Sequence, residues 1–187
     1  MQNSTSKVRV LTGTAMLGAV AAVLMYLEFP IPIMPAFVKL DVSELPALIA
    51  SFAYGPVSGI LVCLIKNLIK LPSTSTAAVG ELFNFVMGAL FVGVAGLIYK
   101  RNKTRKGAIV GALLGALVMA VVSVPYNYFI VYPAYVVMYH LPLDAIIGMY
   151  QAINPNVNGL LACLLVFNLP FTFVKGALDA ALCFLVY

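Results

Sequence analysis

The chain has 187 residues, of which 63% are hydrophobic and only 9% are charged. Soluble domains carry about 25% charged residues, so this composition excludes an ordinary soluble domain and indicates a membrane protein. The formal net charge of +5 does not indicate nucleic-acid binding, because the basic residues gather in short loops, as is typical of membrane topology. No long polar stretch is visible, and we therefore expect a single membrane domain over residues 1–187.

The first apolar run, residues 10–27, is long enough to cross a bilayer and is expected to be a transmembrane helix. A proline-rich loop follows over residues 29–41, where the prolines exclude a helix. Ser43 is expected to cap a helix that begins at Glu44, because a serine side chain can accept a hydrogen bond from the first helical turn. Gly55 and Pro56 then interrupt the apolar run, which predicts a turn between two short helices.

Further spans are expected over residues 78–99 and 107–129, and a last one within residues 160–187, which Asn168 and Pro170 should split. The loop at residues 100–106 holds five basic residues and no acid, so it should be cytoplasmic, and so should the basic N-terminus. An even number of crossings must lie between them. The sequence therefore predicts an all-α integral membrane protein, a six-transmembrane-helix bundle with both termini cytoplasmic and the first loop outside.

Ionisable side chains lie in or beside the apolar runs, although each charge costs a few kcal/mol in lipid unless it meets a partner or a cavity. They are Asp41, Glu44, Glu81, Lys175 and Asp179. Lys175 and Asp179 are four residues apart, so a pair between them on one helix face is an alternative to a pocket role.

Amide and hydroxyl groups fall at the same outer depth as the first loop in the six-span arrangement. They are Asn84, Asn127, Asn168 and Thr172. This convergence predicts a small-molecule pocket near the outer surface, with several hydrogen-bonding groups and aromatic walls. The tyrosines between residues 126 and 139 are expected mainly to form an aromatic belt at the membrane surface.

The sequence contains no nucleophile–base pair, no metal-ligand spacing and no phosphate-binding loop, so we expect neither an enzyme, nor a metal site, nor a cofactor. The three cysteines lie in apolar runs without paired spacing and are expected to be buried. A small chain with a pocket and no means of using ATP is best explained as a binding subunit of a larger importer.

Small residues form stripes on two of the expected helices. Ala15 and Ala19 would let another helix approach closely, either within this chain or in a second membrane protein. A similar stripe of Gly107, Gly111 and Gly115 is expected to pack internally.

Several segments taken together resemble a known family. They are the Ala15-x-x-x-Ala19 stripe, residues 39–41, residues 43–48, the pair Gly55 and Pro56, residues 80–85 and residues 169–176. In these the chain resembles the substrate-binding membrane subunits (S components) of energy-coupling factor vitamin importers, most closely the riboflavin-specific ones. The resemblance covers nearly the whole chain. It departs at Thr172, where the riboflavin group often has asparagine and where a hydroxyl can take the place of an amide.

The resemblance implies riboflavin as the transported ligand, captured outside the cell at a bacterial plasma membrane by a six-helix protein whose first loop caps the pocket. It also implies docking to a transmembrane coupling protein driven by two ATPase subunits, with Ala15 and Ala19 at the contact. The residues it implies for the ligand are Val38, Leu40 and Asp41 on the loop wall and Asn127, Thr172 and Lys175 as polar contacts. On geometry alone we add Glu81, Asn84 and Asn168.

A flavin has a flat face that suits aromatic and aliphatic walls and a uracil-like edge that suits amides or a lysine. Other readings stay open at this point. The chain could be an S component for another vitamin, such as thiamine or biotin, although the absence of tryptophan disfavours a cationic ring. It could also be a small stand-alone membrane carrier or channel, or a membrane enzyme or assembly factor.

Overall fold

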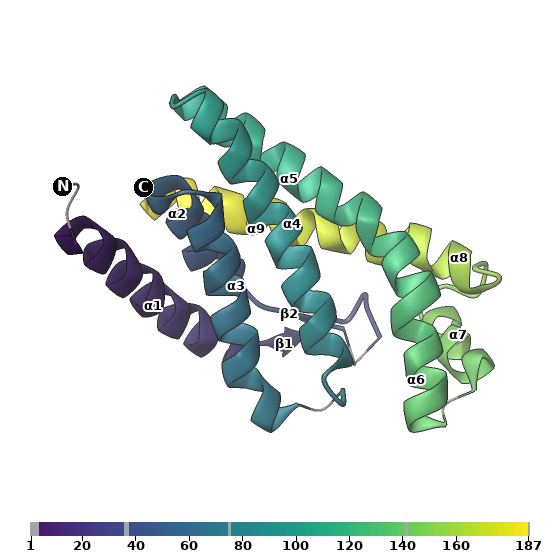
Figure 1. The fold of residues 1–187 in the computed structure, drawn as a ribbon. Coiled ribbons are helices and arrows are strands. Elements are labelled where there is room, and N and C mark those ends of the chain that lie inside the picture. Colours follow the sequence, from purple (N-terminus) through teal and green to yellow (C-terminus); the bar gives the residue numbers. More distant parts are fainter. Residues whose placement is uncertain (1–3, 36–37, 75, 141, 187) are drawn as a thin grey trace.

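Helices make up nearly all of the structure, a computed structural model that describes residues 4–35, 38–74, 76–140 and 142–186 (Figure 1). In chain order they are α1 (Ser4–Tyr26), α2 (Glu44–Tyr54), α3 (Pro56–Lys70), α4 (Val79–Arg101), α5 (Arg105–Tyr126), α6 (Tyr132–Tyr139), α7 (Leu143–Gln151), α8 (Leu160–Cys163) and α9 (Leu169–Val186). Shorter helical segments are η1 (Leu71–Ser73), η2 (Asn127–Val131) and η3 (Leu164–Asn168). Two-residue strands, β1 (Phe29–Pro30) and β2 (Lys39–Leu40), pair antiparallel in the first loop.

Five helical segments within the described residues are long and apolar enough to cross a membrane. They are Lys7–Tyr26, Pro56–Ser73, Val79–Arg101, Arg105–Met138 and Leu160–Val186. The chain is therefore an all-α, multi-pass membrane protein. Helix α2 has 11 residues and is too short to cross alone at about 1.5 Å per residue, so the expected count of six crossings stays a prediction.

The turn expected at Gly55 and Pro56 separates α2 from α3. Gly55 has φ +104°, a backbone conformation that favours glycine because it has no Cβ. Pro56 begins α3, where its missing N–H is tolerated and its fixed φ suits the first helical position. Helix α3 then runs back beside α2, and the Ser51 hydroxyl of α2 donates a hydrogen bond of 2.7 Å to the Val92 carbonyl of α4.

The last helix is not split, contrary to the expectation from Asn168 and Pro170. A π-helical segment, η3, joins α8 to α9, so the helical path continues from residue 160 to residue 186. A second π-helical segment, η2, joins α5 to α6, with Pro133 at the start of α6. Proline removes a hydrogen bond and crowds the preceding turn, and a widened turn just before it accommodates both effects without ending the helix.

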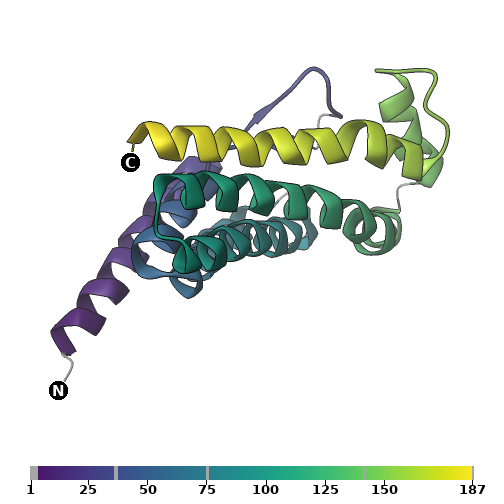
Figure 2. The same cartoon turned by 90° about the horizontal axis from the view of Figure 1, so that it is seen from above.

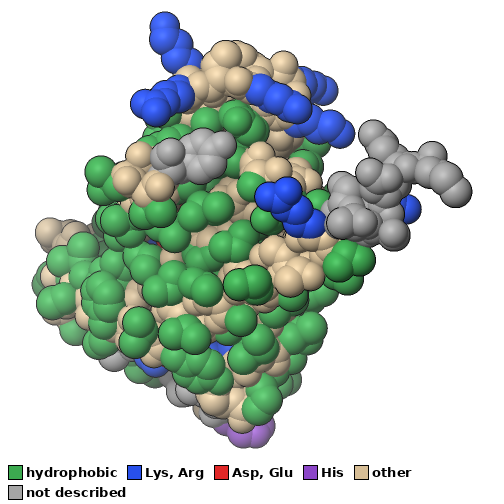
Figure 3. Space-filling model, turned by 90° about the vertical axis from the view of Figure 1, so that its left-hand side faces the viewer, with side chains coloured by type: hydrophobic (Ala, Val, Ile, Leu, Met, Phe, Trp, Pro, Cys, Tyr) green, Lys and Arg blue, Asp and Glu red, His purple; other side chains and the backbone are tan. Residues whose placement is uncertain are grey.

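The two ends of the bundle differ in charge. The described N- and C-terminal residues, the α2–α3 turn and the α4–α5 connection lie at one end, while α6 and α7 lie at the other (Figures 1 and 2). Lysine and arginine side chains gather at one end of a largely hydrophobic surface (Figure 3). The cytoplasmic position of the basic loop remains a prediction from the positive-inside tendency.

Helices α4 and α5 pack closely through the glycine stripe of α5, as expected for internal packing. A Cβ atom added at Gly115 would lie 2.5 Å from the Phe91 backbone oxygen, and one at Gly111 would lie 2.8 Å from the Ala95 backbone oxygen. Backbone atoms cannot rotate away as a side chain can. The two glycines therefore set how closely the two helices approach each other.

We predict that Gly115→Ala lowers thermal stability in detergent, with a loss of about 1–3 kcal/mol because the added methyl group overpacks the α4–α5 contact. The matched control is Gly148→Ala on α7, where an added Cβ meets nothing within 4 Å. Thermal unfolding of the two purified variants is the measurement. Equal unfolding temperatures would contradict this account of the helix contact.

Candidate functional site

A cavity lies at the end of the bundle away from the basic loop, between the first loop and the ends of several helices. Its lining comes from the end of α1, the first loop, α2, α3, the loop before α4, α4, α5, η2, α6, η3 and α9. Eight of the nine predicted ligand-binding residues are on its wall: Val38, Asp41, Glu81, Asn84, Asn127, Asn168, Thr172 and Lys175. The ninth, Leu40, pairs with Phe29 in the short ladder and is half-buried beside the cavity residues Lys39 and Asp41.

Three asparagines bring amide groups to the cavity from different helices. The Oδ1 atom of Asn84 is buried and has no hydrogen-bond partner among the described residues. Asn127 donates to the Ser123 carbonyl at 2.8 Å, which satisfies one of its amide hydrogens and leaves the rest of the group at the cavity wall. The Oδ1 atom of Asn168 accepts a hydrogen bond of 2.7 Å from the hydroxyl of Tyr150.

The π-helical segments explain why two of these asparagines reach the cavity. Asn127 begins η2 and Asn168 ends η3, and each segment precedes a proline by two residues. A π turn shifts the following side chains around the helix relative to a regular α-helix, and such turns are common at functional sites. The prolines therefore help to place amide groups on one wall.

Lys175 forms two ion pairs at the cavity wall, where its ammonium lies 2.8 Å from Asp41 Oδ2 and 3.2 Å from Glu44 Oε2. This excludes the alternative in which Lys175 pairs with Asp179 on the same helix, because its partners come instead from the first loop and α2. Glu44 also accepts a hydrogen bond of 2.6 Å from Lys66 of α3, a residue with no solvent exposure. Four segments are thus tied together through two lysines.

Ser43 does not cap α2, contrary to expectation. It has a helical backbone conformation, and its side chain makes no capping hydrogen bond. Its backbone N–H donates to Asp41 Oδ1 at 2.9 Å, and its hydroxyl also donates to that oxygen while accepting from Lys66. Ser43 therefore binds Asp41 and Lys66 instead of the first turn of α2. The frequency of serine at helix N-termini does not predict this use of the side chain.

Asp41 is buried but ionised. Burial by itself raises the pKa of this carboxyl, but the ammonium groups of Lys175 and Lys66 outweigh burial, aided by hydrogen bonds from Lys175 and Ser43. Its pKa therefore lies well below the ordinary value for aspartate. Asp41 presents a fixed negative charge at the cavity wall over the whole physiological pH range.

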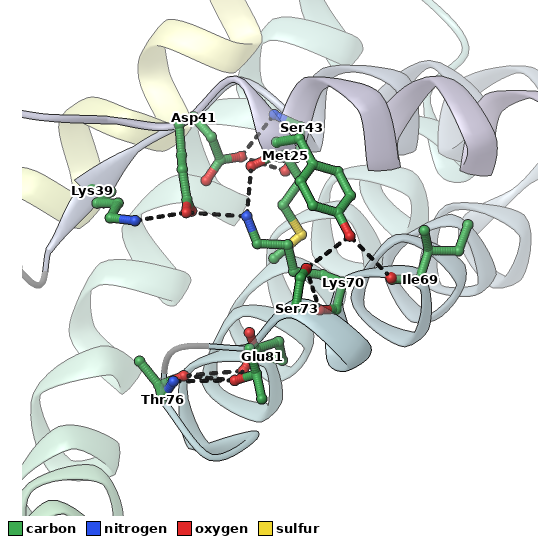
Figure 4. Close-up of polar contacts among 12 residues, drawn as sticks. Met25, Lys39, Asp41, Ser43, Ile69, Lys70, Ser73, Thr76 and Glu81 are labelled. Carbon is green, nitrogen blue, oxygen red and sulfur yellow. Dashed lines mark hydrogen bonds and ion pairs between the residues drawn. The ribbon is translucent and has the colours of Figure 1, made fainter.

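A second carboxylate, Glu28, ties the first loop to α3. Lys39 Nζ lies 2.8 Å and Lys70 Nζ 3.0 Å from the same Glu28 oxygen, and Lys70 also donates to the Met25 carbonyl at 3.4 Å (Figure 4). Burial by itself raises the pKa of Glu28. Hydrogen bonds and positive charge from Lys39 and Lys70 lower the pKa by more than burial raises it, so the net shift is downward. Both lysines and Glu28 line the cavity.

Glu81, at the start of α4, is bound by two threonines of the preceding loop. Thr74 donates to its Oε2 at 2.7 Å and Thr76 donates to the same oxygen at 3.0 Å (Figure 4). These bonds fix one carboxylate oxygen. Glu81 and Thr76 both remain on the cavity wall.

Apolar and aromatic side chains supply the rest of the wall. They are Met25, Phe83, Met87, Met119, Val131, Tyr132, Tyr135 and Phe171. The expectation that the tyrosines form a membrane-surface belt is wrong for Tyr132, which is only 1% exposed. Its hydroxyl lies 2.5 Å from the Tyr150 hydroxyl in the interior. Burial raises the pKa of Tyr150 far above its ordinary value, so this phenol stays neutral and can donate to Asn168.

Sequence reasoning missed several residues of the site. Glu28, Lys39, Lys66, Lys70 and the Tyr132–Tyr150 pair are not among the predicted ligand-binding residues. A lysine within an apolar run that follows a helix containing a glutamate is the available signal for Lys66, since a buried charge needs a partner. The tyrosine pair depends on how α6 and α7 fold back, for which there is no sequence signal.

The predicted docking residues lie on a different surface. Ala15 and Ala19 are exposed on α1, whereas Gly18 faces inward, where an added Cβ would lie 2.8 Å from Ile65. The small-residue stripe is therefore not used for packing within this chain at these two alanines.

The cavity offers amide, hydroxyl and charged groups around apolar walls, which suits reversible binding of a flat, polar-edged molecule.

The chain matches known proteins over nearly its whole length. The family described as "ECF transporter, substrate-specific component" matches residues 9–187. A riboflavin transporter of Staphylococcus aureus is 34% identical over 92% of this chain and 85% of its own length, and one of Bacillus subtilis is 34% identical over 91% and 85%. A solved structure titled as the S component of a bacterial ECF transporter aligns with a TM-score of 0.76 and 32% identity, covering 97% of this chain and 94% of the other.

We predict that Asp41→Asn lowers stability at neutral pH by roughly 3–5 kcal/mol, because it leaves Lys175 with less compensating charge in a buried site. The folded-state pKa of Asp41 is lowered, so its stabilising contribution is present above about pH 4 and is lost as the pH falls below it. Thermal unfolding from pH 7 down to pH 3 should decline less steeply for the variant than for the parent.

The control for this experiment is Asp144→Asn, the same change at an exposed position of α7. It should keep both the stability and the acid decline of the parent protein. An Asp41→Asn protein as stable as this control at neutral pH would show that the ion pair with Lys175 contributes nothing.

Proposed function

Because the chain belongs to the family of ECF transporter substrate-specific components, we propose that it binds riboflavin and mediates its uptake together with an ECF energy-coupling module. The observation that carries this proposal is the match, along nearly the whole chain, to relatives that are themselves named riboflavin transporters. Members of this family are transport components, so the chain is not an enzyme. The same matches favour riboflavin over thiamine or biotin and disfavour a stand-alone carrier.

The cavity suits a flavin in two respects. Phe83, Phe171 and Tyr135 offer flat or apolar faces for the ring system, and methionines fill irregular space beside them. The uracil-like edge of the ring carries both donors and acceptors, which amide groups can match because each amide is both. Asn84, Asn127 and Asn168 lie on the wall in the same cavity.

The charged groups suit the remaining parts of the ligand. Lys175 can donate a hydrogen bond to a carbonyl of the flavin edge while it stays bound to Asp41. The carboxylates Asp41 and Glu81 can accept from the ribityl hydroxyls, and the Thr172 hydroxyl can do either. Val38 and Leu40 belong to the loop segment that covers this side, and in our proposal the loop caps the bound vitamin.

Orientation follows from charge. The strongly basic connection at residues 100–106 lies at the opposite end of the bundle from the cavity, so the positive-inside tendency places the cavity toward the extracellular side. Both termini are then cytoplasmic. A ligand would enter from outside the cell and be captured there before transport.

Transport requires a partner, because the chain has no motif for ATP hydrolysis. In our proposal the partner is a transmembrane coupling protein that works with two ATPase subunits. The exposed alanines of α1 are the proposed contact, since small side chains let a second helix approach closely in a membrane.

Titration of the purified protein with riboflavin tests the proposed ligand. We expect saturable quenching of flavin fluorescence and a yellow colour that stays with the protein during purification. Thiamine and biotin should not compete. A protein that binds either of those vitamins and leaves flavin fluorescence unchanged would overturn the proposal.

We predict that Asn84→Ala weakens riboflavin binding about tenfold, because it removes a buried acceptor that has no protein partner among the described residues. For the same reason its thermal stability should be equal to or above that of the parent, since an unsatisfied buried polar atom is removed. Fluorescence titration and thermal unfolding measure the two effects. Asn156→Ala, at an exposed loop position, is the control and should change neither. Unchanged affinity in Asn84→Ala would place the ligand elsewhere.

We predict that Ala15→Trp or Ala19→Trp abolishes uptake in cells that contain the whole importer, while riboflavin binding by the purified subunit is retained. An indole group on the exposed face of α1 blocks close approach of another helix without touching the cavity. Val121→Trp, at an exposed position of α5, is the control and should transport normally. Loss of binding in the α1 variants would show that these alanines pack within the subunit instead.

A further inference from the structure

Five ionisable side chains lie together where the first loop, α2, α3 and α9 meet, and we call them the buried charge cluster: Asp41, Glu44, Lys66, Lys175 and Asp179. Four of them are at most 4% exposed, and the side chain of Lys175 is 12% exposed. The cluster contains three carboxyl groups but only two ammonium groups. With all five ionised it would carry an uncompensated negative charge.

Asp179 differs from the other two acids in its contacts. Asp41 accepts hydrogen bonds from Ser43 and Lys175, and Glu44 forms ion pairs with both lysines. Asp179 has no solvent exposure, yet neither of its carboxyl oxygens has a hydrogen-bond partner among the described residues. It lies one helical turn beyond Lys175 on α9, deeper than the cavity wall.

The charged groups around Asp179 come from several elements. They are Glu44 on α2, Lys66 on α3, Asp41 in the first loop and Lys175 on α9. The thiols of Cys63 on α3 and Cys183 on α9 also lie near it. Helix α5 brings Ala116 and Met119 against the adjacent Gly176. Two of the charged neighbours are carboxylates, and no ammonium group lies within ion-pair distance of Asp179 among the described residues.

An unpaired charge in this position is strongly unfavourable, because it is removed from water and lies within the membrane region. Addition of one proton neutralises the cluster. The proton is least favourable on Asp41 and Glu44, whose oxygens are already engaged by ammonium groups. The Oε2 atom of Glu44 lies 3.2 Å from Lys175 Nζ but has no hydrogen bond among the described residues, so it keeps the capacity to accept one.

We propose that Asp179 is a buried proton-binding site that keeps the charge cluster neutral, with Glu44 and Asp41 as its carboxylate neighbours. Protonated Asp179 leaves Lys175 bound to Asp41 and Glu44 at the cavity wall. Loss of the proton to solvent leaves Asp179 as a free carboxylate one helical turn from Lys175. This carboxylate then attracts the Lys175 ammonium away from the cavity. Asp179 is thus a positioning residue for Lys175, and this consequence for ligand affinity rests on the proposed function.

Infrared spectroscopy of the purified, ligand-free protein tests the proton directly. At neutral pH the parent protein and the Asp144→Asn control should show the C=O stretch of a dehydrated carboxylic acid, and Asp179→Asn should lack it. The same band in Asp179→Asn, or its absence from the parent, would overturn the proposal. The measurement needs no riboflavin, so its outcome does not depend on the identity of the ligand.

Riboflavin titration across pH provides the second measurement. The affinity of the parent should fall as the pH is raised into the range where the carboxylic-acid band disappears. Asp179→Asn, which resembles the protonated acid, should bind at neutral pH within about threefold of the parent and should lose the alkaline decline. A neutral-pH loss of more than about tenfold, or an affinity that depends on sodium rather than pH, would mean that Asp179 is ionised.

The two measurements separate the possible failures. An infrared band that depends on Asp179, together with no riboflavin binding by the parent, would overturn the proposed ligand and leave the proton site standing. Riboflavin binding without the band would do the reverse. If Asp179→Asn does not fold, the band of the parent protein alone decides, since its absence contradicts the proposal.

Discussion

The cavity depends on the ion pairs that one lysine of the last helix forms with two carboxylates from the first third of the chain. Lys175 joins Asp41 and Glu44, and Lys66 binds Glu44 from a third helix. In lipid these charges are tolerable only when they meet one another. The requirement for pairing therefore holds α2, α3, α9 and the first loop in one arrangement, and the paired groups form the polar floor of the cavity.

The walls of the cavity depend on a different constraint, the accommodation of proline inside long helices. Pro133 and Pro170 would each break a regular helix, but a π turn precedes each of them. These turns keep the helical path continuous and bring Asn127 and Asn168 to the cavity wall. The irregular backbone is sheltered by neighbouring helices, as membrane proteins require. One local solution thus serves both the fold and the site.

Much of the site could be predicted because a polar group in an apolar run has few acceptable explanations. Asn84, Asn127 and Thr172 were found in this way, and the positions of the basic residues gave a common depth for them. The partners could not be predicted. Helices that are apolar all round give no clue to their rotation, so the sequence does not show which acids Lys66 and Lys70 meet. Ser43 and Tyr132 were assigned from their usual roles, a cap and a belt, and the folded chain uses them as hydrogen-bonding groups in the interior.

The two ionic attachments of the first loop differ in their access to water. Lys39 and Glu28 have side-chain exposures of 37% and 23%, whereas Lys175 and Asp41 have 12% and 4%. Dissolved ions screen exposed charges within about 10 Å at 0.1 M ionic strength and reach buried pairs far less. A rise in ionic strength therefore weakens the pair of Lys39 with Glu28 more than the pair of Lys175 with Asp41, so the strand ladder responds to salt while the Asp41 end of the loop stays bound.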